Sequence, residues 1–257
     1  MANPKQHLQG LNPEQARAVT TTEGPVLILA GAGSGKTKTL THRIAYLLAE
    51  HKASPYNILA VTFTNKAARE MRERVANLIG ANAEERSFMP FMGTFHSICV
   101  RILRQDGVHD GIDSRFVIFD ESDRKSLIKR LIKAQSVNEM QFNERSITSA
   151  ISSAKNEMID PGEYRELAGD PLQKIVARLY PLYEAELRKA QALDFDDLIG
   201  RTVKILSTNS AIREKWQSQF RYIMIDEYQD TNAAQYKLVR LLTSPLNNIC
   251  VVGDDWQ

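Results

Sequence analysis

The sequence has few cysteines. Only two of the 257 residues are cysteines, Cys99 and Cys250, and they lie far apart in apolar surroundings without a CxxC pair. This pattern predicts neither a disulfide framework nor a cysteine zinc site. We therefore expect both residues to be buried, structural thiols in a reducing compartment.

The sequence also lacks any long apolar segment. No stretch approaches the roughly 20 apolar residues that a membrane span needs. The first ten residues, MANPKQHLQG, contain no apolar core of a signal peptide. We therefore expect a cytoplasmic protein that does not associate with membranes.

Net charge is small as well. The chain carries 33 basic and 31 acidic residues, a formal net charge of +2. This balance gives no overall attraction to nucleic acid, so a nucleic-acid partner must be inferred from local motifs. Hydrophobic residues make up 43% and charged residues 25%, which is ordinary for a globular chain of one large domain or two modest ones.

Short apolar runs alternate with segments of helical periodicity. Four strong runs read as buried strands, at residues 25–30, 57–63, 222–226 and 248–253, and two weaker ones at 91–93 and 116–119. Such alternation predicts an α/β fold with a mostly parallel sheet.

The middle of the chain, from about residue 121 to 189, has a helical pattern. Residues 120–123 offer N-cap chemistry, and an apolar stripe follows at Leu127, Ile128, Leu131 and Ile132. Basic residues fall largely off this stripe, at Arg124, Lys125, Lys129, Arg130 and Lys133. A charge run of this kind is usually a solvated face. We interpret the region as a helical insertion, which divides the chain into residues 1–110, 111–190 and 191–257.

Residues 30–37, AGAGSGKT, are typical of a phosphate-binding loop. They follow an apolar strand and lead into a helix predicted over residues 37–49. The glycines let backbone N–H groups curl around a phosphate, and the helix N-terminus adds its positive dipole end. Lys36 is expected to reach the β- and γ-phosphates and Thr37 to bind Mg²⁺. Ala30 departs from the usual pattern, which begins with glycine.

A second acidic element follows a late apolar strand. Asp226 and Glu227 end the run YIMI, which is the pattern of a Walker B element. Asp226 is expected to face Mg²⁺, and Glu227 to accept a proton from the water that attacks the γ-phosphorus. Taken alone, an Asp-Glu pair after a strand is more often a solvated turn, but the phosphate loop in the same chain favours the catalytic interpretation.

The joint set of motifs resembles the UvrD/Rep/PcrA group of superfamily 1 DNA helicases. The blocks that carry the resemblance stand in family order at Leu11–Gln15, Thr62–Ala68, Gly93–Ser97, Leu193–Leu198, Asp226–Asn232 and Val252–Gln257. The resemblance implies a RecA-like P-loop NTPase domain with a parallel sheet, interrupted by a mostly helical subdomain. We expect the chain to be the N-terminal motor part, subdomains 1A and 1B, of a longer protein whose second motor domain supplies arginine fingers and part of the DNA track.

The resemblance implies roles for individual residues. The catalytic set comprises Lys36, Asp226, Glu227 and Gln257, where Gln257 would sense the γ-phosphate. The ATP-binding set comprises Gln15, Ala32, Gly33, Ser34, Gly35, Lys36, Thr37 and Lys38. Gln15 would contact the adenine, and Lys38 stands where many relatives carry arginine. Thr37 and Asp226 would bind Mg²⁺. The DNA-binding set comprises Thr62, Phe63, Thr64, Asn65, Thr94 and His96, with Phe63 stacking on a base.

The implied activity is ATP-dependent 3′-to-5′ translocation and unwinding, with ATP and Mg²⁺ as cofactors and single-stranded and junction DNA as partners. We expect the 257-residue chain to be a monomer that does not unwind DNA by itself, whereas the longer parent could self-associate on DNA. Two alternatives stay open: a fragment of an AddA/RecB-like helicase-nuclease subunit, and a module that binds nucleotide or single-stranded DNA without catalysis.

Overall fold

The computed structural model describes residues 7–31, 33–85, 87–138 and 140–254. The chain divides into two compact units. Unit 1 comprises Met1–Ile98, Asn209–Thr231 and Val239–Gln257, and unit 2 comprises Cys99–Thr208 and Asn232–Leu238. The α-helices of the described residues are α1 (Pro13–Thr20), α2 (Lys36–Ala49), α3 (Asn65–Ile79), α4 (Phe95–Asp106), α5 (Glu121–Ala134), α6 (Glu144–Asn156), α7 (Pro161–Leu167), α8 (Pro171–Lys189), α9 (Phe195–Thr208), α10 (Ser210–Gln219) and α11 (Ala233–Leu242).

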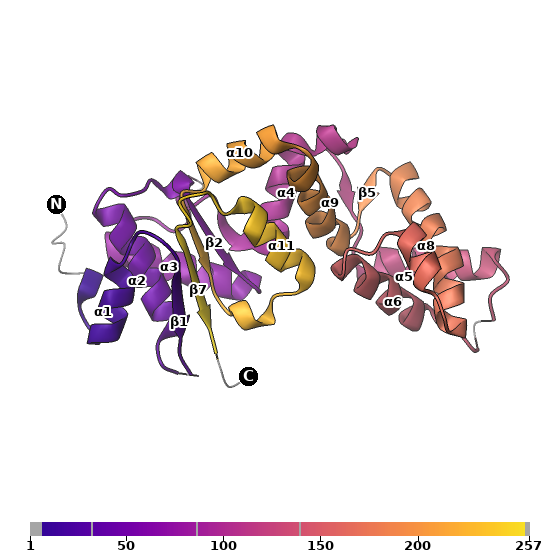
Figure 1. Ribbon diagram of the computed structural model, residues 1–257, viewed down its shortest axis with the longest axis horizontal. Helices are drawn as coiled ribbons and strands as arrows, with labels where there is room; N and C mark the ends of the chain where they lie inside the picture. The colour runs from indigo at the N-terminus through magenta and orange to yellow at the C-terminus, as the bar shows by residue number, and fades with distance from the viewer. Residues whose placement is uncertain (1–6, 32, 86, 139, 255–257) are drawn as a thin grey trace. The chain divides into compact units, whose positions relative to one another are not determined.

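A five-stranded parallel sheet forms the centre of unit 1. Its strands are β1 (Val26–Leu29), β2 (Ile58–Thr62), β3 (Met92–Thr94), β6 (Tyr222–Ile225) and β7 (Ile249–Gly253). They are ordered β1-β7-β6-β2-β3 and every neighbouring pair is parallel (Figure 1). Because the strands are parallel, their carboxyl ends meet at one edge of the sheet, where ligands of open α/β sheets bind.

Helices α2 and α3 cover one face of this sheet. Leu40 and Ile44 of α2 and Met71 and Val75 of α3 are fully buried, and they belong to the same core as Met224 in β6. The phosphate loop and the segment after β2, which lead into these helices, are thereby anchored to a rigid core. Helix α3 has well-defined ends, because Thr64 caps its first turn and Gly80 ends it in the left-handed conformation at φ 69°.

A buried arginine joins α1 to α2. The guanidinium of Arg43 donates hydrogen bonds to the carbonyl oxygens of Ala18, Thr21 and Thr22, at and after the C-terminus of α1. Carbonyls at the end of a helix lack partners within the helix, and here the guanidinium satisfies these three oxygens in place of water. The segment that carries Gln15 is thus fixed against the helix that follows the phosphate loop.

Unit 2 is mainly helical. Helices α5, α6 and α8 share a core that includes Leu127, Ile128, Leu131 and Ile132, the four positions predicted as an apolar stripe. Asp120 caps α5 in a reciprocal bond with Asp123, as the sequence predicted. A two-stranded parallel sheet pairs β4 (Val117–Ile118) with β5 (Ala192–Leu193).

The four strong strand predictions are confirmed as β1, β2, β6 and β7, and the weaker one at 91–93 corresponds to β3. The run at 116–119 contains β4, which pairs outside the central sheet, with the unpredicted β5. Unit 2 contains more residues than the predicted insertion at 111–190. Among the additional residues is α9, which packs on α6 and β5. The predicted subdomain bounds therefore remain a prediction.

Cys99 and Cys250 are both buried free thiols, as expected. Burial raises the pKa of each thiol, that of Cys250 to about 11. In the part of the chain that the structure describes, no helix has both the length and the hydropathy to cross a membrane.

Candidate nucleotide and DNA site

The predicted site residues gather at the carboxyl edge of the central sheet. Strands β1, β7 and β6 lead into the phosphate loop, Asp254 and Asp226, respectively. Strands β2 and β3 lead into the segments that contain Phe63 and His96. The strand order therefore places the predicted nucleotide residues on one half of the edge and the predicted DNA residues on the other.

The phosphate loop has the backbone that its glycines allow. Gly33 and Gly35 have φ values of 75° and 89°, in the region that disfavours side chains. Gly35 begins α2 without any side-chain cap, so the first N–H groups of that helix remain available to an anion. Ser34 is fixed by its hydroxyl, which donates to the carbonyl of Gly31 at 2.6 Å.

Lys36 lies between two carboxylates. Its Nζ donates to Oδ2 of Asp254 at 2.9 Å and lies 3.7 Å from Oε2 of Glu227. The hydrogen bond to Asp254 raises the pKa of Lys36, which keeps the ammonium charged. The phosphate loop, the end of β7 and the end of β6 thus meet at one cation.

The residues predicted to bind Mg²⁺ are in contact. The Thr37 hydroxyl donates to Oδ2 of Asp226 at 3.1 Å. Asp226 is 3% exposed, and its other oxygen, Oδ1, is buried without a hydrogen-bond partner in the described residues. Burial and the neighbouring Glu227 raise the pKa of Asp226 against the opposing effect of the Thr37 bond. A nearby cation would remove this penalty.

This donor set fits Mg²⁺. The ion is usually held by one or two carboxylates, with substrate phosphates and waters completing its coordination. Thr37 and Asp226 supply one hydroxyl and one carboxylate. No cluster of three or more His, Cys, Asp or Glu side chains suited to a metal occurs among the described residues.

Glu227 stands at a strained turn directly after β6. Its backbone lies in the left-handed region at φ 51° and ψ 49°, which is uncommon for a residue with a side chain. Its Oε2 accepts a hydrogen bond of 2.8 Å from Nε2 of Gln229. The sequence prediction did not assign a role to Gln229, although it lies within the motif DEYQD.

The predicted adenine residue touches the phosphate loop. Nε2 of Gln15 donates to the Ser34 carbonyl at 3.0 Å, and Oε1 accepts from the Asn12 backbone at 3.0 Å. An amide has two N–H groups and two lone pairs, so one of each remains for a base. A cavity of about 660 Å³ lies beside Gln15 and is lined by Arg17, Leu27 and Leu29, among others. Lys38 donates to the carbonyl of Gly10, just before this segment.

The predicted DNA residues lie on β2, β3 and the turns that follow. Thr62 and Thr94 are register partners in the sheet, and both are buried. Phe63 is half-buried, with its ring 5.7 Å from that of Phe95 in an edge-to-face arrangement. The exposed Thr64 and Asn65 begin α3, and the half-buried His96 lies in the first turn of α4.

Gly93 shows why the segment after β3 has its shape. A Cβ at this position would collide with the hydroxyl of Ser97, which donates to the carbonyl of Thr94 at 2.8 Å. The Thr94 hydroxyl in turn accepts from the Ser97 backbone at 3.3 Å. The turn that presents His96 therefore depends on a residue without a side chain.

Most charges of the basic segment 124–133 are paired within unit 2. Arg124 lies 3.1 Å from Asp196, and Arg130 donates to Glu186 at 2.7 Å. Lys125 and Lys129 lie within 4 Å of Glu144. These pairs partly neutralise the positive charge of the segment.

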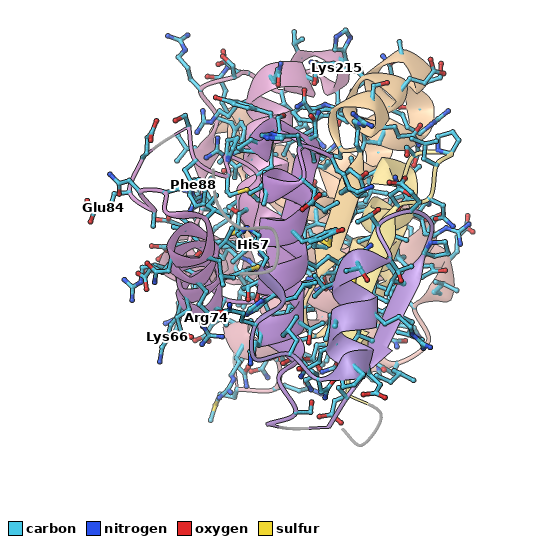
Figure 2. The ribbon with its side chains drawn as sticks, turned by 90° about the vertical axis from the view of Figure 1, so that its left-hand side faces the viewer. His7, Lys66, Arg74, Glu84, Phe88 and Lys215 are labelled. Carbon is cyan, nitrogen blue, oxygen red and sulfur yellow. The ribbon has the colours of Figure 1, made fainter. Side chains whose placement is uncertain are left out.

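Two predicted site residues, Ala32 and Gln257, lie outside the described residues. The side chain of Lys66, at the start of α3, points outward in Figure 2. Lys66 follows Asn65 directly, so the exposed beginning of α3 carries a positive charge next to the predicted DNA residues.

Comparison with known proteins agrees with this geometry. A family model described as the UvrD/REP helicase N-terminal domain matches residues 11–257. The chain is 52% identical over 250 residues to the ATP-dependent DNA helicase PcrA of Staphylococcus aureus strain Mu50, and 51% identical over 252 residues to that of Bacillus subtilis strain 168. It matches the PcrA of Staphylococcus epidermidis at 50% identity.

These alignments cover 97% to 98% of this chain but only 34% of each relative, so the chain spans about a third of the length of the curated relatives it matches. The match of the family model extends over nearly every residue, from the segment of Gln15 to the segment after β7. The chain therefore belongs to the UvrD/REP helicase N-terminal domain family.

Proposed function

We propose that this chain binds ATP with Mg²⁺ and single-stranded DNA as the N-terminal motor part of an ATP-dependent DNA helicase that translocates 3′ to 5′. The observation that carries the proposal is the arrangement along one sheet edge. The phosphate loop, Asp226, Glu227 and Asp254 meet around Lys36, and the aromatic Phe63 follows the adjacent strand β2.

Each nucleotide-site residue has a distinct task in this proposal. Lys36 and the free N–H groups at the start of α2 bind the phosphates. Thr37 and Asp226 would hold Mg²⁺, which would neutralise phosphate charge. Glu227 accepts the proton of the attacking water. A bond forms between the water oxygen and the γ-phosphorus, and the bond to the bridging oxygen breaks. ADP leaves with that electron pair.

The DNA half of the site supports binding without sequence preference. An aromatic face stacks on any base. The exposed polar groups at the start of α3 follow Phe63 closely in the chain, so they can contact the sugar-phosphate backbone of the same DNA strand. Because the two halves share one sheet edge, movements of the nucleotide residues can reach the DNA residues through adjacent strands β6 and β2, which are paired from Ile58 with Tyr222 to Val61 with Ile225.

The nucleotide assignment is tested by calorimetric titration of Mg²⁺-ATP into the 257-residue chain. Lys36→Ala should weaken binding by at least about tenfold, since a buried, charge-assisted phosphate contact contributes 1.4 kcal/mol or more. Lys52→Ala, which removes an exposed lysine shortly after α2, is the matched control and should bind like the unsubstituted chain. Equal affinity of the Lys36→Ala and unsubstituted chains would remove the basis for the proposal.

A further inference from the structure

Four residues, among them the proposed catalytic Glu227, form a closed ring of polar contacts. Lys36 contacts Asp254 at 2.9 Å, and the backbone N–H of Asp254 donates to Oε1 of Gln229 at 3.2 Å. Nε2 of Gln229 donates to Oε2 of Glu227 at 2.8 Å, and that oxygen lies 3.7 Å from Lys36. The proposed reaction assigns no task to two members of this ring, Gln229 and Asp254, and of these only Gln229 contacts Glu227.

Both ends of the Gln229 amide are used, and their partners fix its orientation. The carboxylate of Glu227 can only accept and the backbone of Asp254 can only donate, so the amide must present its NH₂ to the first and its oxygen to the second. Glutamate at this position could not donate to Glu227 when ionised, and methionine could offer neither bond.

Gly253 supplies an independent indication that the amide is built into the site. A Cβ added at this residue would lie 3.2 Å from Oε1 of Gln229, tighter than ordinary contact. The end of β7 thus leaves room for the amide at the point where it accepts from the next residue. A larger residue at position 253 would crowd the amide oxygen of Gln229, so the glycine fits the hydrogen bond that this oxygen accepts.

The hydrogen bond from Gln229 restrains the carboxylate of Glu227. Glu227 has a side chain that is 37% exposed, on a left-handed backbone after β6. Oε2 is held by its bond to Gln229 and lies close to Lys36, whereas Oε1 makes no hydrogen bond within the described residues. A general base works only when it is held within hydrogen-bond reach of the proton that it accepts.

We propose that Gln229 is a positioning residue that holds Oε2 of Glu227, so that Oε1 accepts the proton of the attacking water. This inference rests on the proposed function, and it assigns the base to one oxygen atom. Gln229 acts through Glu227 and does not touch the nucleotide. Its second bond ties the orientation of Glu227 to the backbone at the end of β7.

The test separates positioning from binding and from folding. Hydrolysis of Mg²⁺-ATP is measured in single turnovers with the 257-residue chain in excess, and affinity is measured by titration with a non-hydrolysable ATP analogue. Gln229→Met, Gln229→Glu and Glu227→Gln are compared, together with the double variant Glu227→Gln/Gln229→Met. Gln217→Met is the matched control, because Gln217 also bonds with its amide, to the carbonyls of Leu241 and Thr243.

Both Gln229 variants should slow hydrolysis by at least about tenfold, while analogue affinity stays within about twofold. In the Glu227→Gln background, Gln229→Met should have no further effect, because effects of residues that act as a unit are not additive. Gln217→Met should hydrolyse ATP like the unsubstituted chain.

Three results would overturn the inference. They are an equal loss of rate in both backgrounds, a loss of affinity as large as the loss of rate, or hydrolysis by the unsubstituted chain that is no faster than by Glu227→Gln. In the last case nucleotide binding would still stand. Failure of the unsubstituted chain to bind the analogue would instead reject the proposed function itself.

Discussion

Phe63 shows how one side chain could serve both the core and a ligand. Directly after β2, the ring of Phe63 packs edge to face against that of Phe95. The residue is only partly buried, so part of it remains accessible. A purely structural phenylalanine at this place would be replaceable by an aliphatic residue of similar volume at small cost. A stacking platform would not, because stacking requires the aromatic face.

Substitution of Phe63 therefore separates the two roles. Phe63→Leu should weaken binding of a fluorescent single-stranded oligonucleotide by about 5- to 150-fold, since stacking contributes about 1–3 kcal/mol per base. Phe63→Trp should retain binding. Fluorescence anisotropy over a salt series is the measurement, and affinity should fall as salt rises because phosphate contacts release counterions. Unchanged affinity of the Phe63→Leu chain would place Phe63 in the core alone.

The identity of most site residues could be predicted, but their contacts could not. Lys36, Thr37, Asp226 and Glu227 stand in local patterns whose chemistry is specific. The bond between Lys36 and Asp254 joins residues 218 positions apart, and no local pattern shows which carboxylate reaches the lysine. Gln229 was missed for the same reason, since its role depends on a backbone N–H that the fold brings from the end of β7.

At the level of elements, a buried ionic cluster joins α6, α8 and α9 in unit 2. Nζ of Lys155, in α6, lies 2.6 Å from Glu184, 2.9 Å from Asp194 and 2.8 Å from Asp197. Burial alone would lower the pKa of Lys155, but the three carboxylates raise it well above its usual value. No local pattern predicts this cluster, because Lys155, Glu184 and the pair Asp194 and Asp197 come from separate parts of the chain.

One carboxylate of this cluster, that of Asp197, has a raised pKa. Burial, together with Asp194 and Glu184, raises the pKa of Asp197 to about 7 against the opposing effect of Lys155. Its usual value is 3.8. Between these two pH values the folded protein holds a proton that the unfolded chain has released. Stability therefore falls as pH rises from about 4 to 7.

We accordingly expect the contribution of Asp197 to favour folding at pH 5 more than at pH 8. Urea unfolding of the unsubstituted chain and of Asp197→Asn at both pH values isolates this contribution, because other groups cancel in the comparison. The free energy of unfolding of the Asp197→Asn chain relative to the unsubstituted chain should be higher at pH 8 than at pH 5. A difference that is the same at both pH values would show that Asp197 stays ionised throughout.

The strands illustrate why some elements are predictable and others are not. The central strands β2 and β6 are buried at every position, so they read as continuous apolar runs. The pair β4 and β5 has only two residues in each strand, which is too short for any periodicity. Its pairing depends on the backbone of residues about 75 positions apart, such as Val117 with Ala192.

At the scale of the whole molecule, the question is which steps of a helicase reaction this chain can carry out alone. The chain matches 34% of the length of its PcrA relatives. Movement along DNA requires two DNA-holding parts whose relative position changes with nucleotide state. Related NTPases also gain about 10³- to 10⁵-fold in rate from an arginine finger, which the family resemblance places in the second motor domain.

We therefore expect the 257-residue chain to bind Mg²⁺-ATP and single-stranded DNA but not to separate strands. Phosphate release should be slow and should rise by less than about twofold on addition of single-stranded DNA, because the family resemblance implies that a second motor domain supplies the arginine finger. Forked duplexes with a 3′ or a 5′ tail report strand separation and its direction, and the complete PcrA of Bacillus subtilis, whose N-terminal third is 51% identical to this chain, is the positive control. Unwinding by the 257-residue chain alone, or strong stimulation of its phosphate release by DNA, would mean that a single copy or a self-associated pair of these chains supplies every group that the reaction needs.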